Sequence, residues 1–200
     1  MPLRLESVSH TFRGGRQLFR DVSWVFEEGR IHGVVGPSGC GKSTLLAIVA
    51  GMLAPTSGRV VRPSASTIAW VFQNPIGVAR RSAIDHVALP LLARGWTRRE
   101  AEREADELLE AFGLAGRRRA EFGELSGGEA QRLMLARGIA SHPTVLLIDE
   151  PTAQLDRATS SEVNGVLGRL AGRGTAVIVA THDETTRRCC SRILDLGQPQ

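Results

Sequence analysis

Lysine and tyrosine are almost missing from this chain of 200 residues. It contains no tyrosine, and among its 25 basic residues only Lys42 is a lysine, so every other basic side chain is an arginine. Arginine is a wide planar fork, whereas lysine is a compact charge on a flexible stem. A glycine-rich loop that wraps around phosphates has room for a lysine ammonium group but not for an arginine guanidinium group. The position of the one lysine is therefore informative.

Cysteines and long apolar runs are also scarce. The three cysteines, Cys40, Cys189 and Cys190, are spaced neither as a metal site nor as a disulfide framework, which favours a reducing compartment. No apolar run approaches the roughly 20 residues that a membrane span needs, and the start of the chain has no secretory signal pattern. We therefore expect a soluble chain that would reach a membrane only through a partner.

The charge balance suggests anionic partners of some kind. The net charge is +4 and the longest basic run, residues 117–119, lies between a helical pattern and a loop. No basic stretch is interleaved with aromatic residues, so scattered arginines on a solvated surface are favoured over a nucleic-acid footprint.

Apolar runs alternate with helical patterns along the chain, and this predicts an α/β fold with a mostly parallel sheet. The predicted strands are residues 3–8, 21–26, 31–35, 68–72, 144–148, 175–180 and 192–196. The predicted helices are residues 42–51, 82–94, 97–112 and 155–170, with another starting at residue 126, and residues 54–58 form a turn cluster. Residues 74–140 carry helical patterns and no strong strand, so we expect a helical subdomain inserted into one domain that spans residues 1–200.

The lysine lies in a phosphate-binding pattern, G-x-x-x-x-G-K-[ST], that follows an apolar run and precedes a helical one. The pattern consists of Gly36, Pro37, Ser38, Gly39, Cys40, Gly41, Lys42, Ser43 and Thr44. Backbone amides of such a loop and the following helix N-terminus hold phosphates. Lys42 is then expected to bridge the β- and γ-phosphates of ATP, and the Ser43 hydroxyl to bind Mg²⁺.

Two carboxylates follow a second apolar run about a hundred positions later. Asp149 and Glu150 end the run 145–148, and in a parallel sheet this puts them beside the phosphate loop. Asp149 is the expected partner of Mg²⁺, and Glu150 is then free to orient or deprotonate the attacking water. Two carboxylates that only cap a strand end are the weaker alternative.

The stretch Ser126-Gly127-Gly128-Glu129 has the spacing of a helix capping box. Two glycines at a helix N-terminus expose amides and a positive dipole end to an anion. Alone, this stretch would be only a helix cap. In a chain that also has a phosphate loop and an acidic strand end, this stretch is interpreted as a second phosphate-binding site. Such a second site is explained if it binds the γ-phosphate held by another subunit.

Together these motifs resemble the ATP-binding cassette (ABC) ATPases, over essentially the whole chain. The motifs, in the family's order, are GPSGCGKST, Gln73 of the Q-loop, LSGGEAQR, VLLIDEP, the D-loop pair Leu155-Asp156, and His182 in VATHD. The resemblance implies a P-loop core with antiparallel N-terminal strands and an inserted helical subdomain. It also implies a head-to-tail dimer that sandwiches two ATP molecules.

The resemblance further implies residue roles. Phe12 would stack on adenine, Gln73 would sense Mg²⁺ and couple to a partner, and His182 would be the γ-phosphate switch. The signature motif from Ser126 to Glu129 would bind the partner's ATP, with Ser126 and Gly128 on the γ-phosphate, and Asp156 of the D-loop would be a further nucleotide-binding residue.

The sequence departs from the family's usual pattern at three places. Gln154 stands in the D-loop where a small residue is usual, and Glu129 ends the signature where glutamine is commoner. Glu129 still completes the capping box, so we expect little loss there. Residues 76–80 are less bulky than usual, at the place where a membrane partner would dock.

The resemblance favours the ATPase subunit of a membrane ABC transporter. It would work as a homodimer or a paired cassette on integral membrane permease subunits, peripheral at the cytoplasmic face, without binding nucleic acid. The alternative is a soluble ABC ATPase that acts on nucleic acid or ribosomes, but such relatives carry a long coiled coil or two cassettes. A P-loop kinase or GTPase would leave LSGGE and His182 unexplained.

Overall fold

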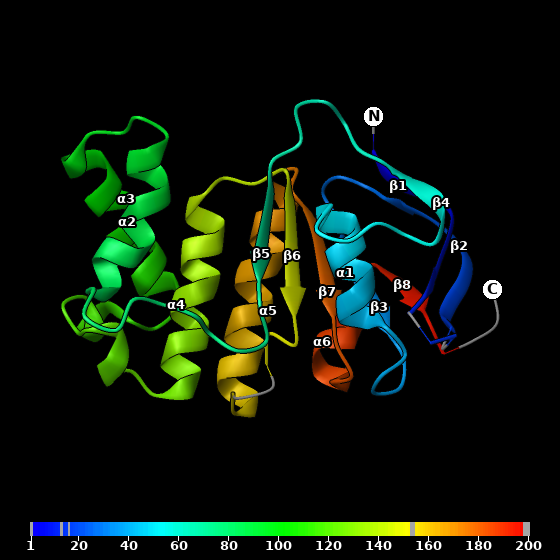
Figure 1. Ribbon diagram of the computed structural model, residues 1–200. Coiled ribbons are helices and arrows are strands. Elements are labelled where there is room, and N and C mark those ends of the chain that lie inside the picture. The colour runs from blue at the N-terminus through cyan, green and yellow to red at the C-terminus, as the bar shows by residue number, and fades with distance from the viewer. Residues whose placement is uncertain (1, 13, 16, 153–154, 198–200) are drawn as a thin grey trace.

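Two β-sheets and a group of helices form the molecule (Figure 1). The computed structural model describes residues 2–12, 14–15, 17–152 and 155–197. The antiparallel sheet has the order β2-β1-β4, with β1 Leu3–Thr11, β2 Gln17–Phe26 and β4 Ser57–Val61. The parallel sheet has the order β5-β6-β7-β3-β8, with β5 Ile68–Val71, β6 Val145–Asp149, β7 Ala176–Ala180, β3 Ile31–Val35 and β8 Arg192–Asp195.

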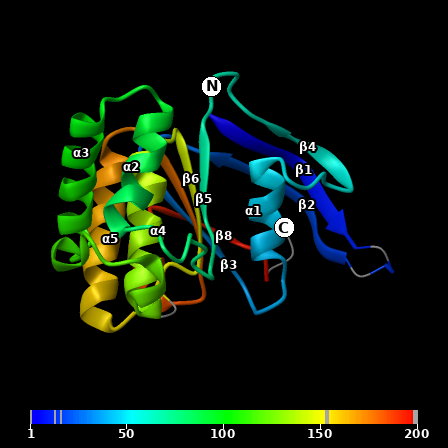
Figure 2. The ribbon, with the colours of Figure 1, turned by 60° about the vertical axis from the view of Figure 1, so that its left-hand side comes forward.

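Both faces of the parallel sheet are buried, which is why its central strands are continuous apolar runs. In β6, Leu146 and Ile148 pack into one apolar cluster, whereas Val145 and Leu147 pack into another. The second cluster contains helix α1, Lys42–Ala50, which lies between the two sheets (Figure 2). The first contains helix α5, Arg157–Gly172, on the opposite face.

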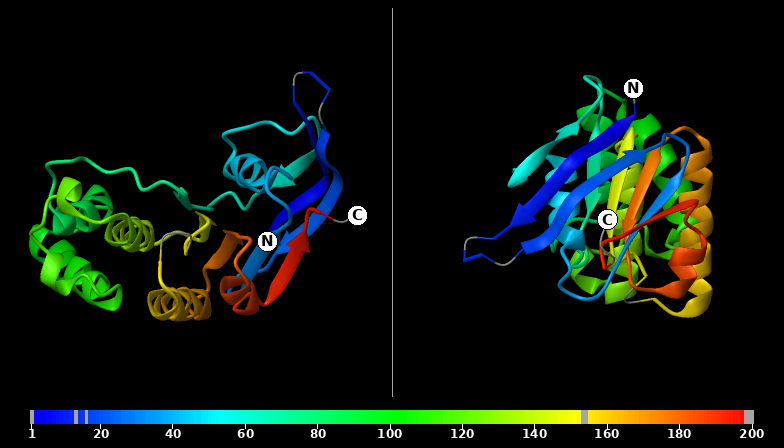
Figure 3. Two further views of the ribbon diagram at one scale, coloured as in Figure 1. Left: turned by 90° about the horizontal axis from the view of Figure 1, so that it is seen from below. Right: turned by 90° about the vertical axis from the view of Figure 1, so that its right-hand side faces the viewer.

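Three helices between β5 and β6 make the helical subdomain at the far side of the parallel sheet from the N-terminal strands (Figure 3). They are α2 Ala83–Ala93, α3 Arg98–Ala111 and α4 Gly127–Ala140, with the 3₁₀ turns η1 Ala115–Arg117 and η2 Phe122–Glu124 between α3 and α4. The predicted capping box at the start of α3 is present, since Thr97 and Glu100 accept each other's backbone N–H. The remaining short helix, α6, spans Glu184–Arg188. The fold class predicted from the sequence is thus confirmed.

The sequence-based prediction was wrong at β4, which it treated as part of a turn cluster. Gly58 has a φ of +76°, and a Cβ there would lie 2.2 Å from the Ser7 carbonyl oxygen. Ser7 itself sits at a bulge in β1, so β4 can pair with β1 only if the backbones approach closely. Gly58 is therefore required by the close contact between β4 and β1 rather than by a turn. This requirement depends on the partner strand β1.

The predicted start of the last long helix was also wrong. Residue 155 lies outside α5, because Asp156 is its N-cap and accepts the Thr159 backbone N–H at 3.0 Å. A side chain that satisfies a first-turn amide fixes where a helix begins.

All five parallel strands end at one edge of their sheet, the lower edge in Figure 1. The loop 36–41 follows β3 there, Glu150 follows β6, and residues 181–182 follow β7. In open α/β sheets, ligands bind outside the carboxyl ends of the strands, so this edge is where a site is expected.

Candidate functional site

A pocket of about 620 Å³ opens at this edge, between the loop after β3 and the ends of β6 and β7. Its lining comprises Phe12, Leu18, Gly36, Pro37, Ser38, Gly39, Gly41, Lys42, Ser43, Thr44, Gln73, Asp149, Glu150 and His182. These residues come from distant parts of the chain and include most of those selected from the sequence. Leu18 was not predicted, because it lies in strand β2 and belongs to none of the sequence motifs.

Lys42 is fixed by the loop that precedes it. Its Nζ donates to the carbonyl oxygens of Gly36 at 3.0 Å and Pro37 at 3.3 Å, and only 8% of the residue is exposed. An ammonium group has three protons, so two hydrogen bonds to the loop leave one for a ligand. The loop therefore holds a cation at the pocket wall.

Two glycines let the loop fold this tightly. Gly36 has a φ of +145°, and a Cβ there would lie 2.7 Å from the Cys40 sulfur. Gly41 has a φ of +106° and is the N-cap of α1, with Leu18 and Phe19 about its missing Cβ at 3.0–3.1 Å. Both backbones are in the left-handed region that favours glycine, so a side chain at either position would strain the loop.

Asp149 is a buried carboxylate at the pocket floor, with 6% of the residue exposed. Burial raises the pKa of Asp149, while the hydrogen bond from Ser43 and the charge of Lys42 oppose that increase. A desolvated carboxylate beside a hydroxyl is a pair of oxygen donors, which are the ligands that Mg²⁺ prefers.

Glu150 is held in an unusual backbone conformation, with a φ of +50°. Its amide donates to the Ala180 carbonyl at 2.9 Å, which ties it to the end of β7. Its carboxylate accepts three hydrogen bonds, from the Thr181 hydroxyl at 3.3 Å, the His182 amide at 3.4 Å and His182 Nδ1 at 2.7 Å. Strained backbone of this kind concentrates at functional sites.

His182 is paired with this carboxylate although its own side chain is 70% exposed. Because a carboxylate only accepts hydrogen bonds, Nδ1 carries the proton and Nε2 is the ring atom left for another contact. The sequence did not indicate this contact, because Glu150 and His182 end neighbouring strands that are far apart in the chain.

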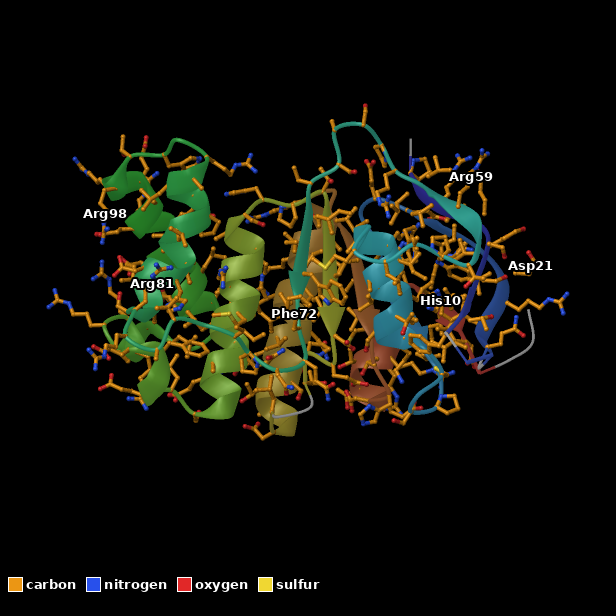
Figure 4. The ribbon with its side chains drawn as sticks, viewed as in Figure 1. His10, Asp21, Arg59, Phe72, Arg81 and Arg98 are labelled. Carbon is orange, nitrogen blue, oxygen red and sulfur yellow. The ribbon has the colours of Figure 1, made fainter. Side chains whose placement is uncertain are left out.

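Phe12 and Gln73 line opposite parts of the same pocket. Phe12 is 48% exposed, and its ring is perpendicular to the His10 ring, with 5.2 Å between ring centroids. Gln73 follows Phe72, which Figure 4 labels beyond the end of β5. An exposed aromatic face at the rim is a surface on which a flat base can stack.

Several predicted site residues do not line this pocket. The Cys40 side chain packs against the apolar cluster around α1, and its amide donates to the Pro37 carbonyl at 3.2 Å. The signature residues Ser126, Gly127, Gly128 and Glu129 and the helix cap Asp156 belong to other helix N-termini. Of the D-loop, Ala153 and Gln154 fall outside the described residues.

The signature motif has a geometry of its own at the start of α4. Ser126 Oγ accepts the Glu129 amide at 3.3 Å, and Glu129 Oε2 accepts the Ser126 amide at 2.8 Å, which is the capping box predicted from the sequence. Arg117 adds a bond from its Nε to Glu129 Oε1 at 2.8 Å. This arginine belongs to the basic run 117–119, but only the fold brings it to the motif.

Comparisons with known proteins agree with this geometry. A model of the ABC transporter family matches residues 19–153. The chain belongs to the ABC transporter family. It is 36% identical to the methionine import ATP-binding protein MetN 2 of Rhodococcus jostii, over 98% of this chain and 63% of that protein. It is also 36% identical to the lipoprotein-releasing system ATP-binding protein LolD 2 of Caulobacter vibrioides, over 96% of this chain and 91% of that protein.

Among solved structures, the chain is similar to that of the ATP-binding cassette MJ0796. That structure is described as a dimeric post-hydrolysis state bound to ADP and Pi. The TM-score is 0.89 at 29% identity, over 99% of this chain and 96% of the other. The chain spans less than two thirds of the methionine-import relatives and about nine tenths of the lipoprotein-release relative. Within the described part of this ABC chain, no helix combines the length and apolarity needed to cross a membrane.

Proposed function

We propose that this chain is the ATP-binding and ATP-hydrolysing subunit of an ABC transporter, driven by head-to-tail dimerisation on ATP. One observation carries the proposal: a single pocket gathers the phosphate loop, Asp149, Glu150, Gln73 and His182 from separate strand ends. The relatives named for methionine import and lipoprotein release support transport over action on nucleic acid or ribosomes.

In this proposal the loop and the N-terminus of α1 bind the triphosphate. Residues of the loop and of the first turn of α1 line the pocket, and Lys42 supplies a cation that two carbonyls already orient. Phe12 at the rim stacks on the base.

Ser43, Asp149 and Gln73 are the residues that would hold Mg²⁺. The fit rests on oxygen donors in one place: the Ser43 hydroxyl touches the buried Asp149 carboxylate, and Gln73 lines the same pocket. The described residues contain no cluster of three or more acidic, histidine or cysteine ligands. A cation that takes one or two protein ligands and completes its shell with phosphates and water suits this arrangement. When bound, the ion would neutralise charge on the phosphates.

Glu150 is the proposed general base for the attacking water, and His182 positions it. The imidazole Nδ1 and the Thr181 hydroxyl hold the Glu150 carboxylate at the ends of β6 and β7. His182 Nε2 is then free to contact the γ-phosphate. A base held by several hydrogen bonds needs no reorganisation when the proton moves.

The signature motif completes the site of a second subunit. Helices α1 and α4 both begin at the lower edge of the molecule in Figure 1, yet Ser126 to Glu129 do not line the pocket of their own chain. A head-to-tail partner would use both edges, with Ser126 and Gly128 on its γ-phosphate and Asp156 at the interface between the sites. This partner would be either a second copy of the chain or a different, paired cassette.

A membrane permease is the proposed second partner, and it would keep the chain peripheral at the cytoplasmic face. The residues after β5 expose apolar side chains: Phe72 at 42%, Ile76 at 68% and Val78 at 53%. An apolar patch beside Gln73 is suited to a partner whose movement must reach the nucleotide.

The variant Glu150→Gln tests the proposal. Because the amide keeps the shape and loses the base, it should bind ATP, lose at least roughly 100-fold in hydrolysis, and form a stable dimer with ATP. ATP turnover and sedimentation with and without ATP measure this, and Glu107→Gln on the exposed face of α3 is the matched control. Normal turnover in Glu150→Gln would remove Glu150 from its role.

A further inference from the structure

We propose that Arg117 is a positioning residue of the signature motif: its guanidinium neutralises the Glu129 carboxylate, so that the start of α4 can accept the triphosphate of the opposite subunit. This inference rests on the proposed function, because it concerns the dimer that ATP closes. It assigns a role to a residue outside every motif that the sequence displays.

The contact between the two side chains is two-pronged. Arg117 Nε lies 2.8 Å from Glu129 Oε1, and Arg117 Nη2 lies 3.5 Å from Glu129 Oε2. The glutamate side chain is only 17% exposed, whereas the arginine side chain is 48% exposed. A two-pronged contact of this kind fixes direction as well as charge, so Arg117 holds the Glu129 carboxylate in one orientation.

The same carboxylate shapes the Ser126 side chain. Glu129 Oε2 accepts the Ser126 amide, and Ser126 Oγ accepts the Glu129 amide in return. Since the serine oxygen serves here as an acceptor, its hydroxyl proton remains for a phosphate oxygen. Arg117 thus stabilises Glu129, and Glu129 in turn orients Ser126.

Charge is the reason why Arg117 is needed. A glutamate in the first turn favours the helix itself, but it repels an anion that approaches the same helix end. Protonation cannot remove this repulsion, because the hydrogen bonds from Arg117 and the Ser126 amide hold the pKa of Glu129 at about 2. A fixed cation does so instead, and among the described residues Arg117 forms this ion pair with Glu129.

The neighbouring charges do not replace this pair. Arg118 pairs with Asp106 on α3, with Nε 2.6 Å from Oδ1. Glu124 acts on Arg117 through its charge, while its own carboxylate accepts the Glu121 amide at 2.8 Å. Adjacent arginines of one basic run therefore have different partners, which supplies a matched control.

The test is a double-mutant cycle on ATP-dependent dimerisation, with Glu150→Gln as the parent so that ATP persists. Arg117→Ala should weaken the dimerisation constant on the order of tenfold when Glu129 is present. In a Glu129→Gln background, the same Arg117→Ala change should cost less than about threefold, because no charge is left to neutralise. Raising the salt concentration should shrink the first loss, since exposed charges are screened.

Three measurements separate this role from others. Arg118→Ala should change dimerisation by less than about twofold, and Arg117→Lys, which keeps the charge but not the two-pronged contact, should lose less than Arg117→Ala. The ATP affinity of the monomeric variants should match that of the parent within error, while the Arg117 and Glu129 variants should each melt only about 1–4 °C below it. An equal, salt-insensitive loss from Arg117→Ala in both Glu129 backgrounds would overturn the inference, as would no loss at all. Failure of the parent itself to dimerise with ATP would overturn the proposed function instead.

Discussion

Lys42 illustrates how one residue type is demanded by its surroundings. The loop carbonyls of Gly36 and Pro37 approach its Nζ closely, and only 8% of the residue is exposed. A guanidinium is wider and carries its charge over a plane, so the space that fits an ammonium does not fit it. The scarcity of lysine elsewhere in the chain agrees with this local requirement.

Lys42→Arg should therefore be nearly as damaging as Lys42→Ala. We expect both to lower the hydrolysis rate by about 10²–10³-fold, the usual cost of losing a preorganised charge at a transferring phosphate. Steady-state ATPase assays and nucleotide titrations measure this. Wild-type nucleotide affinity in the arginine variant would show that the loop tolerates the fork.

Burial of ionised Asp149 is unfavourable to the folded state of the free protein. Burial raises its folded pKa above the ordinary value. A carboxyl group with a raised folded pKa favours the folded state most at low pH, and that advantage is lost as the pH rises through the folded pKa. At neutral pH the ionised group is therefore destabilising in the free protein.

Asp149→Asn should accordingly raise the unfolding temperature of the nucleotide-free protein at pH 7, and the gain should shrink toward pH 4. The same variant should lose Mg²⁺-dependent ATP hydrolysis. Calorimetry across this pH range checks the first expectation, with the exposed Glu107→Gln on α3 as the control. A lower melting temperature at pH 7 would mean that the lost Ser43 hydrogen bond outweighs the relieved burial.

At the scale of single elements, two helix starts were predicted from capping boxes, whereas the start of α5 was placed one residue ahead of its N-cap, Asp156. The capping boxes at Thr97 and Ser126 are local in sequence, so four residues are enough to specify each. β4 failed for the opposite reason, because its residues become a strand only against the bulged β1. Helix caps formed by neighbouring residues could be predicted from the sequence, whereas the pairing of strands far apart in the chain could not.

The start of α4 gives a prediction at this scale. Because the folded pKa of Glu129 is lowered from 4.5 to about 2, its contribution to stability is present above pH 4.5 and is lost as the pH falls toward 2. Wild type should melt roughly 1–4 °C above Glu129→Gln at neutral pH, and the gap should close in acid. A gap that does not depend on pH would mean that the charge contributes nothing and only the shape does.

At the scale of the whole molecule, one edge of the parallel sheet carries the pocket, and the start of α4 lies at the same end of the molecule in Figure 1. The apolar patch after β5 adjoins both, because Gln73 lies between Phe72 and Ile76 and the Phe72 carbonyl accepts a bond from Gln131 of α4 at 3.4 Å. Motion of a docked partner could thus reach the pocket and the signature helix together.

Ile76→Asp should separate docking from nucleotide chemistry. We expect it to lose a polytopic membrane protein that co-purifies with the tagged wild type from detergent-solubilised host membranes, while ATP affinity is unchanged. Met52→Asp is a matched control, since Met52 is 69% exposed and Ile76 is 68% exposed, on different parts of the surface. Recovery of the same protein with Ile76→Asp would move the docking surface elsewhere, and recovery of ribosomes or DNA by the wild type would contradict the transport proposal.

The sequence by itself determined the α/β class, the phosphate loop, the acidic end of β6 and the capping boxes. Each of these depends on residues within a few positions of one another, where spacing alone fixes the geometry. Only the tertiary structure decided the pairing of Glu150 with His182, the approach of Arg117 to Glu129 and the strand β4. These contacts join segments separated by 12 or more residues, and they exist because the packing of sheets and helices fixes which chain ends meet.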